Sequence, residues 1–125
     1  YLGKLSFKDT ISVMKACQYQ IHLCQIDSCP NAVVEGIVSG LNVLCTNLGG
    51  TKEIVKDNGV VLGVDNWDYR PKRMKNVDSI KPQIVADGIR NLMKIKDPPK
   101  RDDLNIAITA KNYAEIVRKV YYGRD

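Results

Sequence analysis

Two acidic side chains bracket a turn that could hold a sugar and its phosphates. Asp27 and Glu35 are separated by seven residues, and Pro30 lies between them at the expected start of a helix. Proline is tolerated there because the first N–H groups of a helix have no partner within it. These N–H groups and the positive end of the helix dipole favour an anion such as a diphosphate. Carboxylates accept hydrogen bonds in pairs, which suits neighbouring sugar hydroxyls.

The first helical turn after Pro30 provides the candidate anion-binding groups. They are the backbone amides of Asn31, Ala32 and Val33, with Ser28 just before the turn. A plainer interpretation stays open, in which Ser28 caps the helix and the two acids only complement the helix dipole or face solvent. Against this interpretation, Glu35 lies among apolar residues of the expected helix, and an acidic side chain in such surroundings suggests a specific partner.

A second loop, residues 47–53, also joins an expected strand to an expected helix. It contains Gly49 and Gly50, and Glu53 falls in the first turn of the helix. Paired glycines let a ligand approach the main chain, so all three residues are candidates for the same binding site. A plain tight turn, with Glu53 complementing the helix dipole, is the alternative.

The cysteines and the one histidine do not form a metal-binding motif along the chain. No C-x-x-C pair occurs, so we expect no metal site, and we expect reduced, largely buried thiols in a cytoplasmic protein. His22 lies in an expected strand, where a packed or edge histidine is more common than a general base. The four cysteines are Cys17, Cys24, Cys29 and Cys45.

Composition limits the classes of protein that remain. The 125 residues, 44% hydrophobic and 26% charged, are typical of one globular domain, which excludes a disordered chain. No apolar run approaches the roughly 20 residues that a membrane helix needs. The net charge is +5, but aromatic residues do not alternate with the basic ones, so we expect no nucleic-acid partner.

The elements that position these residues alternate along the chain. Expected strands and helices in turn predict an α/β fold, a Rossmann-like parallel sheet of about four strands with helices on both faces. Ligands of such sheets bind beyond the carboxyl ends of the strands, which selects the two loops described above. The expected ranges are strands 2–5, 19–24, 42–46 and 60–62, helices 7–18, 30–39, 51–56, 82–96 and 103–122, and a surface loop, 64–81.

Residues 27–44 and 47–55 together resemble a known family. The pattern of an acid, seven residues, a glutamate, a small-residue helix, a strand and a Gly-Gly-x-x-Glu-Ile-Val turn is similar to the C-terminal domain of GT-B class retaining glycosyltransferases. The resemblance implies that Glu35 binds the ribose hydroxyls of the nucleotide. It also implies that Asp27, where the family usually has Glu, is a catalytic residue whose carboxylate contacts the transferred sugar.

The resemblance implies that residues 1–125 are one nucleotide-sugar-binding domain or a fragment of it. The donor would be a nucleotide-diphosphate sugar, no cofactor would be needed, and the acceptor is unknown. The N-terminal acceptor domain would be missing, so the chain alone should be inactive, and the helix 103–122 would reach back to that domain. Two alternatives stay open: a sugar-nucleotide epimerase of the same architecture, and a non-catalytic module that binds a partner or the periphery of a membrane.

Overall fold

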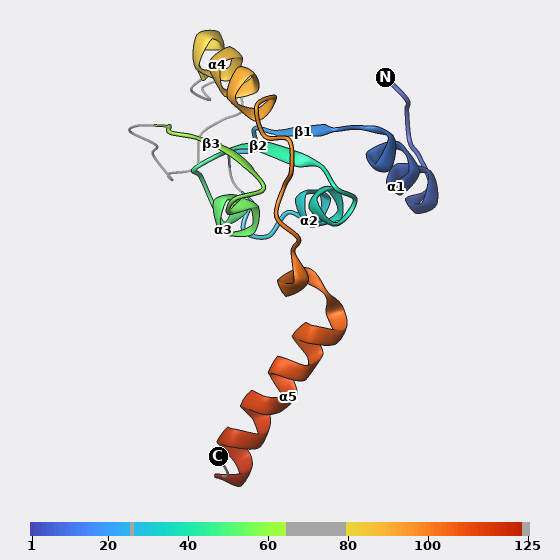
Figure 1. The fold of residues 1–125 in the computed structure, drawn as a ribbon, viewed down its shortest axis with the longest axis vertical. Coiled ribbons are helices and arrows are strands. Elements are labelled where there is room, and N and C mark those ends of the chain that lie inside the picture. Colours follow the sequence, from blue (N-terminus) through green and yellow to red (C-terminus); the bar gives the residue numbers. More distant parts are fainter. Residues whose placement is uncertain (26, 65–79, 124–125) are drawn as a thin grey trace, which may run out of the picture.

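A three-stranded parallel sheet in the order β1-β2-β3 forms the centre of the protein (Figure 1). The computed structural model describes residues 1–25, 27–64 and 80–123. The strands are β1 (Tyr19–His22), β2 (Asn42–Thr46) and β3 (Gly59–Leu62). Helices alternate with them along the chain, which makes the fold Rossmann-like, as the sequence predicts.

The central strand β2 carries the core. All five of its residues are buried, because it pairs with a strand on each side and is covered on both faces. Successive side chains of a strand point to opposite faces. Val43 and Cys45 therefore join one apolar cluster and Leu44 joins another.

Each face of the sheet has its own helices. On one face, α2 (Asn31–Val38) and α3 (Thr51–Val55) pack against Val43 and Cys45. On the other face, α4 (Pro82–Leu92) places Leu92 against Leu44. Figure 1 shows α4 on the opposite side of the sheet from α2 and α3. The expected helices on both faces are thereby confirmed.

The N-terminal expectations are only half right. Residues 2–5 form no strand, so the described sheet has three strands and not about four. The helix α1 (Phe7–Ala16) begins where expected, because the Ser6 hydroxyl accepts the Asp9 N–H at 3.2 Å and caps it. Several other elements are shorter than predicted: β1 stops at His22, and α4 stops at Leu92.

The expected C-terminal helix is divided in two. A short 3-10 turn, η2 (Asp102–Leu104), precedes α5 (Ile106–Tyr122). Asn105 separates them, since its side chain accepts the Ala107 N–H at 2.9 Å and so caps a new helix. Figure 1 shows α5 extending away from the sheet, and none of its residues is buried.

The cysteines are not largely buried: Cys45 is, but Cys17 and Cys29 are exposed and Cys24 is half-buried. Of the expected surface loop 64–81, residues 65–79 lie outside the described part of the chain. Among the helices of the described ranges, none combines the length and the hydrophobicity that a membrane span requires.

Candidate functional site

The two loops selected from the sequence meet at the carboxyl ends of β1 and β2. The Gly50 N–H donates to the Asp27 carbonyl oxygen at 3.0 Å. Closer to the strands, the Thr46 hydroxyl donates to the Cys24 carbonyl oxygen at 3.0 Å. Both contacts follow from the pairing of β1 with β2, which brings the ends of the two strands together.

Gly49 and Gly50 are explained by this contact between loops. A Cβ atom on Gly49 would lie 2.2 Å from the Asp27 carbonyl oxygen, and one on Gly50 would lie 2.1 Å from the Ser28 carbonyl oxygen. Gly49 also has a φ of +63°, which favours glycine. The sequence predicts that these glycines let a ligand approach the main chain. In the structure they instead make room for the main chain of the neighbouring loop.

Asp27 is held at the junction of the loops. One carboxylate oxygen accepts the Cys29 N–H at 3.2 Å, which forms a local turn. The other lies 3.9 Å from the Nε2 atom of His22. About a third of the side chain is exposed, so a ligand can reach it.

The first turn of α2 offers fewer donors than expected. Pro30, and not Ser28, is the N-cap, and no side chain caps the helix. The Val33 N–H donates to the Pro30 carbonyl oxygen at 3.0 Å, and Val33 is fully buried, so its amide is not available to a ligand. Asn31 and Ala32 are exposed, and the described backbone contacts include no acceptor for their N–H groups.

Glu35 lies on the outer side of α2. The helix packs on the sheet through Val33, Gly36 and Ile37, and Glu35 is turned roughly 150° around the helix axis from the centre of that face. It is half-buried, and its carboxylate has no hydrogen bond or ion pair with the described residues. Glu53 is exposed in the first turn of α3. Neither acid is linked to Asp27 by such a contact in the described part of the chain.

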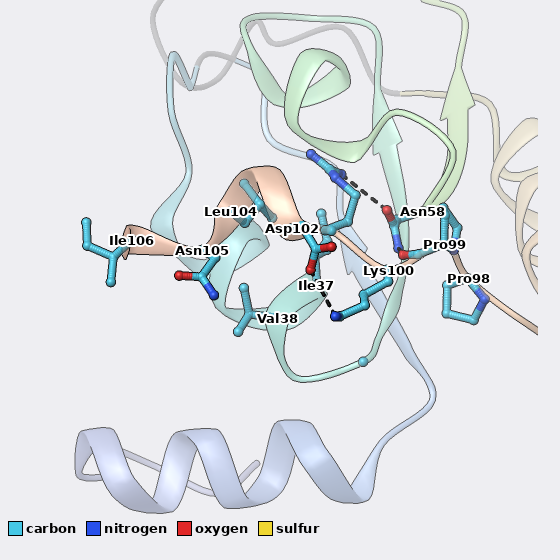
Figure 2. Close-up of a pocket in the computed structure, with 12 residues that line it drawn as sticks. Ile37, Val38, Asn58, Pro98, Pro99, Lys100, Asp102, Leu104, Asn105 and Ile106 are labelled. Carbon is cyan, nitrogen blue, oxygen red and sulfur yellow. Dashed lines mark hydrogen bonds and ion pairs between the residues drawn. The ribbon is translucent and has the colours of Figure 1, made fainter. Parts of the chain in front are cut away.

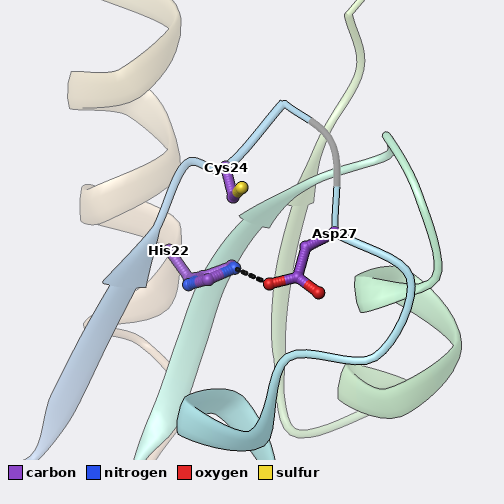
Figure 3. A group of neighbouring side chains, drawn as sticks. All are labelled: His22, Cys24 and Asp27. Carbon is purple, nitrogen blue, oxygen red and sulfur yellow. Dashed lines mark ion pairs between the residues drawn. The ribbon is translucent and has the colours of Figure 1, made fainter.

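The structure also joins residues that their spacing alone does not connect. Potential ligand atoms of His22, Cys24 and Asp27 lie within 4.8 Å of one another, in a group that could hold a metal ion (Figure 3). One feature of the sequence connects two of these residues. His22 and Cys24 are two residues apart at the end of a strand, so their side chains point to the same side. Nothing in the spacing shows that the next loop returns Asp27 to them.

A hollow of about 700 Å³ lies elsewhere (Figure 2). Gly40 and Asn58, which line it, precede β2 and β3, so it lies at the amino ends of the strands, opposite the two loops. Ligands of parallel sheets bind beyond the carboxyl ends of the strands. We therefore place the candidate ligand site at the two loops and not in this hollow. The remaining lining residues are Ile37, Val38, Pro98, Pro99, Lys100, Arg101, Asp102, Leu104, Asn105 and Ile106.

Arg101, which lines this hollow, has a structural role. Its guanidinium donates to the carbonyl oxygens of Ile54 and Val55 and to the Asn58 side chain, and it pairs with Asp103. These contacts tie the segment before α5 to α3 and β3. Hydrogen bonds from Arg101 and then from Lys56 hold the pKa of the Asp103 carboxyl well below its usual range.

Comparisons of this chain with protein-family models, with curated proteins and with solved structures give no match. The arrangement of the described residues therefore carries the functional argument. That arrangement is a Rossmann-like sheet whose first two strands end in touching loops.

Proposed function

We propose that this chain is the donor-binding part of a GT-B class retaining glycosyltransferase, and that it binds a nucleotide-diphosphate sugar. The observation that carries the proposal is the meeting of the two loops at the carboxyl ends of β1 and β2. The sequence pattern from Asp27 to Glu35, and then from Gly49 to Glu53, lies on these loops and the helices that they open. The acceptor domain would belong to the rest of the parent protein.

Four of the candidate residues then have a defined role in binding or transfer. The exposed amides of Asn31 and Ala32 and the dipole of α2 bind the diphosphate. Glu35 accepts hydrogen bonds from the ribose, and Asp27 contacts the transferred sugar. During transfer, fixed dipoles stabilise the negative charge that develops on the leaving diphosphate as the glycosidic bond breaks.

Binding of nucleotide sugars to the 125-residue chain tests this proposal. Ligand-observed NMR with UDP-, GDP- and ADP-sugars, in the presence of EDTA, should detect binding of at least one of them. Glu35→Gln should weaken that binding about tenfold or more, since a hydrogen bond to a charged group contributes about 1.5–3 kcal/mol. Glu115→Gln removes the same charge from α5 and should leave the affinity unchanged.

Two results would contradict the assignment. One is equal affinity in the wild type and Glu35→Gln. The other concerns the full-length parent: unchanged kcat/KM for the nucleotide sugar in Asp27→Asn would remove Asp27 from the site.

The exposed α5 favours a second candidate function, a module that binds an anionic membrane surface. One side of the helix is apolar, and Lys111 and Arg118 lie on the opposite side. Such a helix lies in the membrane interface with its apolar side inward. The large exposed apolar residues of α5 on that side are Ile106, Tyr113, Ile116, Val117, Val120 and Tyr121.

Vesicle flotation distinguishes this second candidate. Binding to vesicles containing phosphatidylserine, but not to phosphatidylcholine alone, should be lost in Val117→Glu and weakened by salt. Ile108→Glu places the same charge on the polar side of α5 and should retain binding. Absence of binding to both kinds of vesicle would exclude this function for the chain.

A further inference from the structure

We propose that His22, Cys24 and Asp27 form a binding site for Zn²⁺, with a fourth position left for water. This inference is separate from the proposed donor binding and does not rest on it. The three residues converge from the end of β1 and from the loop that precedes α2 (Figure 3).

The distances suit a small tetrahedral ion. Zinc bonds of about 2.0–2.3 Å place neighbouring ligand atoms about 3.3–3.7 Å apart. The Nε2 atom of His22 and the Oδ2 atom of Asp27 are 3.9 Å apart, and the ligand atoms of all three residues lie within 4.8 Å. A movement of about 1 Å or less by the side chains would complete the geometry.

The Nε2 atom of His22 is buried and has no hydrogen-bond partner among the described residues. The 3.9 Å separation from Asp27 is too long for a hydrogen bond. A buried polar atom without a partner destabilises the folded state, because it loses its hydrogen bonds to water and gains none in the protein. Coordination of a metal ion by the nitrogen lone pair would remove that destabilisation.

The backbone on each side of the site is fixed by the sheet. His22 pairs with Cys45 of β2, and the carbonyl oxygen of Cys24 accepts the Thr46 hydroxyl at 3.0 Å. Asp27 is tied by its carbonyl oxygen to the Gly50 N–H at 3.0 Å. Ligands that are held in place before the ion arrives need little ordering when it binds.

The ligand types indicate which ion binds. An imidazole nitrogen, a thiolate and a carboxylate oxygen are ligands that zinc uses, whereas Mg²⁺ and Ca²⁺ require oxygen ligands. Zinc binding displaces the proton of the Cys24 thiol to solvent. Three protein ligands and one open position are typical of zinc sites at which a water molecule is bound.

Cobalt substitution tests the site in the reduced 125-residue chain, without nucleotide. Co²⁺ should bind one per chain and give a thiolate-to-cobalt charge-transfer band together with the intense visible bands of tetrahedral coordination. Added Zn²⁺ should abolish both. The charge-transfer band should be lost in Cys24→Ser, and Co²⁺ affinity should fall about tenfold or more in His22→Gln and Asp27→Asn. Cys17→Ser and Cys29→Ser should keep the wild-type spectrum.

A second measurement needs no variant. Zn²⁺ should slow the alkylation of Cys24 by iodoacetamide, read by mass spectrometry, and leave the exposed Cys17 and Cys29 unaffected. The proposal is overturned if no charge-transfer band forms, or if the band persists in Cys24→Ser. Equal alkylation of Cys24 with and without Zn²⁺ would overturn it even if every variant failed to fold.

Discussion

Asp27 connects the two proposals at the scale of single residues. One carboxylate oxygen is held by the Cys29 N–H, and the other faces His22. The proposed sugar contact and the proposed zinc site therefore draw on the same carboxylate. A metal ion bound there would compete with the sugar for Asp27, while the ribose contact at Glu35 would be unaffected.

Cys45 gives a prediction about pH at the same scale. Burial raises the pKa of its thiol to about 11. The unfolded thiol has a pKa of about 8.5. The folded state therefore keeps a proton that the unfolded state loses between these values. The stabilisation is complete below about pH 8.5 and is lost as the pH rises toward 11.

Urea unfolding between pH 8 and pH 10.5 checks this expectation. The free energy of unfolding of the wild type should fall more steeply with pH than that of Cys45→Ala, by at most about 1.4 kcal/mol per pH unit. Cys45→Ala also leaves a cavity in the core, so the slopes and not the absolute stabilities are compared. Equal slopes would show that burial of Cys45 does not perturb its titration.

At the scale of elements, the contact between the two loops depends on Gly49. Gly49→Ala places a Cβ against the Asp27 carbonyl oxygen and strains a residue of positive φ. We expect a loss of about 2 kcal/mol or more in the free energy of unfolding. Nucleotide-sugar and Zn²⁺ binding should weaken as well, because the loop that carries Asp27 would be displaced.

Two glycines elsewhere provide matched controls. Gly40 has a φ of +97° but open space around it, so Gly40→Ala measures backbone strain alone, expected at about 1 kcal/mol. Gly63 has neither constraint, and Gly63→Ala should change stability by less than about 0.5 kcal/mol. Chemical denaturation of the three variants ranks them. An equal loss in Gly49→Ala and Gly40→Ala would contradict the close approach of the loops.

At the scale of the whole molecule, burial is concentrated in the sheet. β2 is buried on both faces, whereas α5 has no buried residue. A single helix of this length is only marginally stable in water without tertiary packing. Hydrogen exchange read by mass spectrometry should therefore show rapid exchange over residues 106–122 and slow exchange over residues 42–46.

Residues 31–38 serve as the control for this experiment, because α2 is shorter than α5 but packs against the sheet. They should exchange more slowly than residues 106–122. Protection of residues 106–122 that grows with protein concentration would instead mean that a second copy covers α5.

Much of the fold is predictable because the signals are local. Ser6 caps α1, Pro30 precedes α2, and alternating short strands and helices predict a parallel sheet. The start of α5 after Asn105 is also predictable from the sequence, because asparagine is a common N-cap residue. The missing strand at residues 2–5 has a different cause: a strand needs a neighbour to pair with, and pattern alone does not provide one.

The amino-acid sequence by itself determined the order of the elements and the two loops at the carboxyl ends of the strands. Tertiary structure decided that Val33 is buried with its amide occupied, that Gly49 fits against Asp27, and that His22 and Cys24 face the same carboxylate. Caps and hydrophobic periods act between residues close in the chain. The meeting of these side chains depends on β1 pairing with β2 and on the path of the loop between them, which local patterns do not specify.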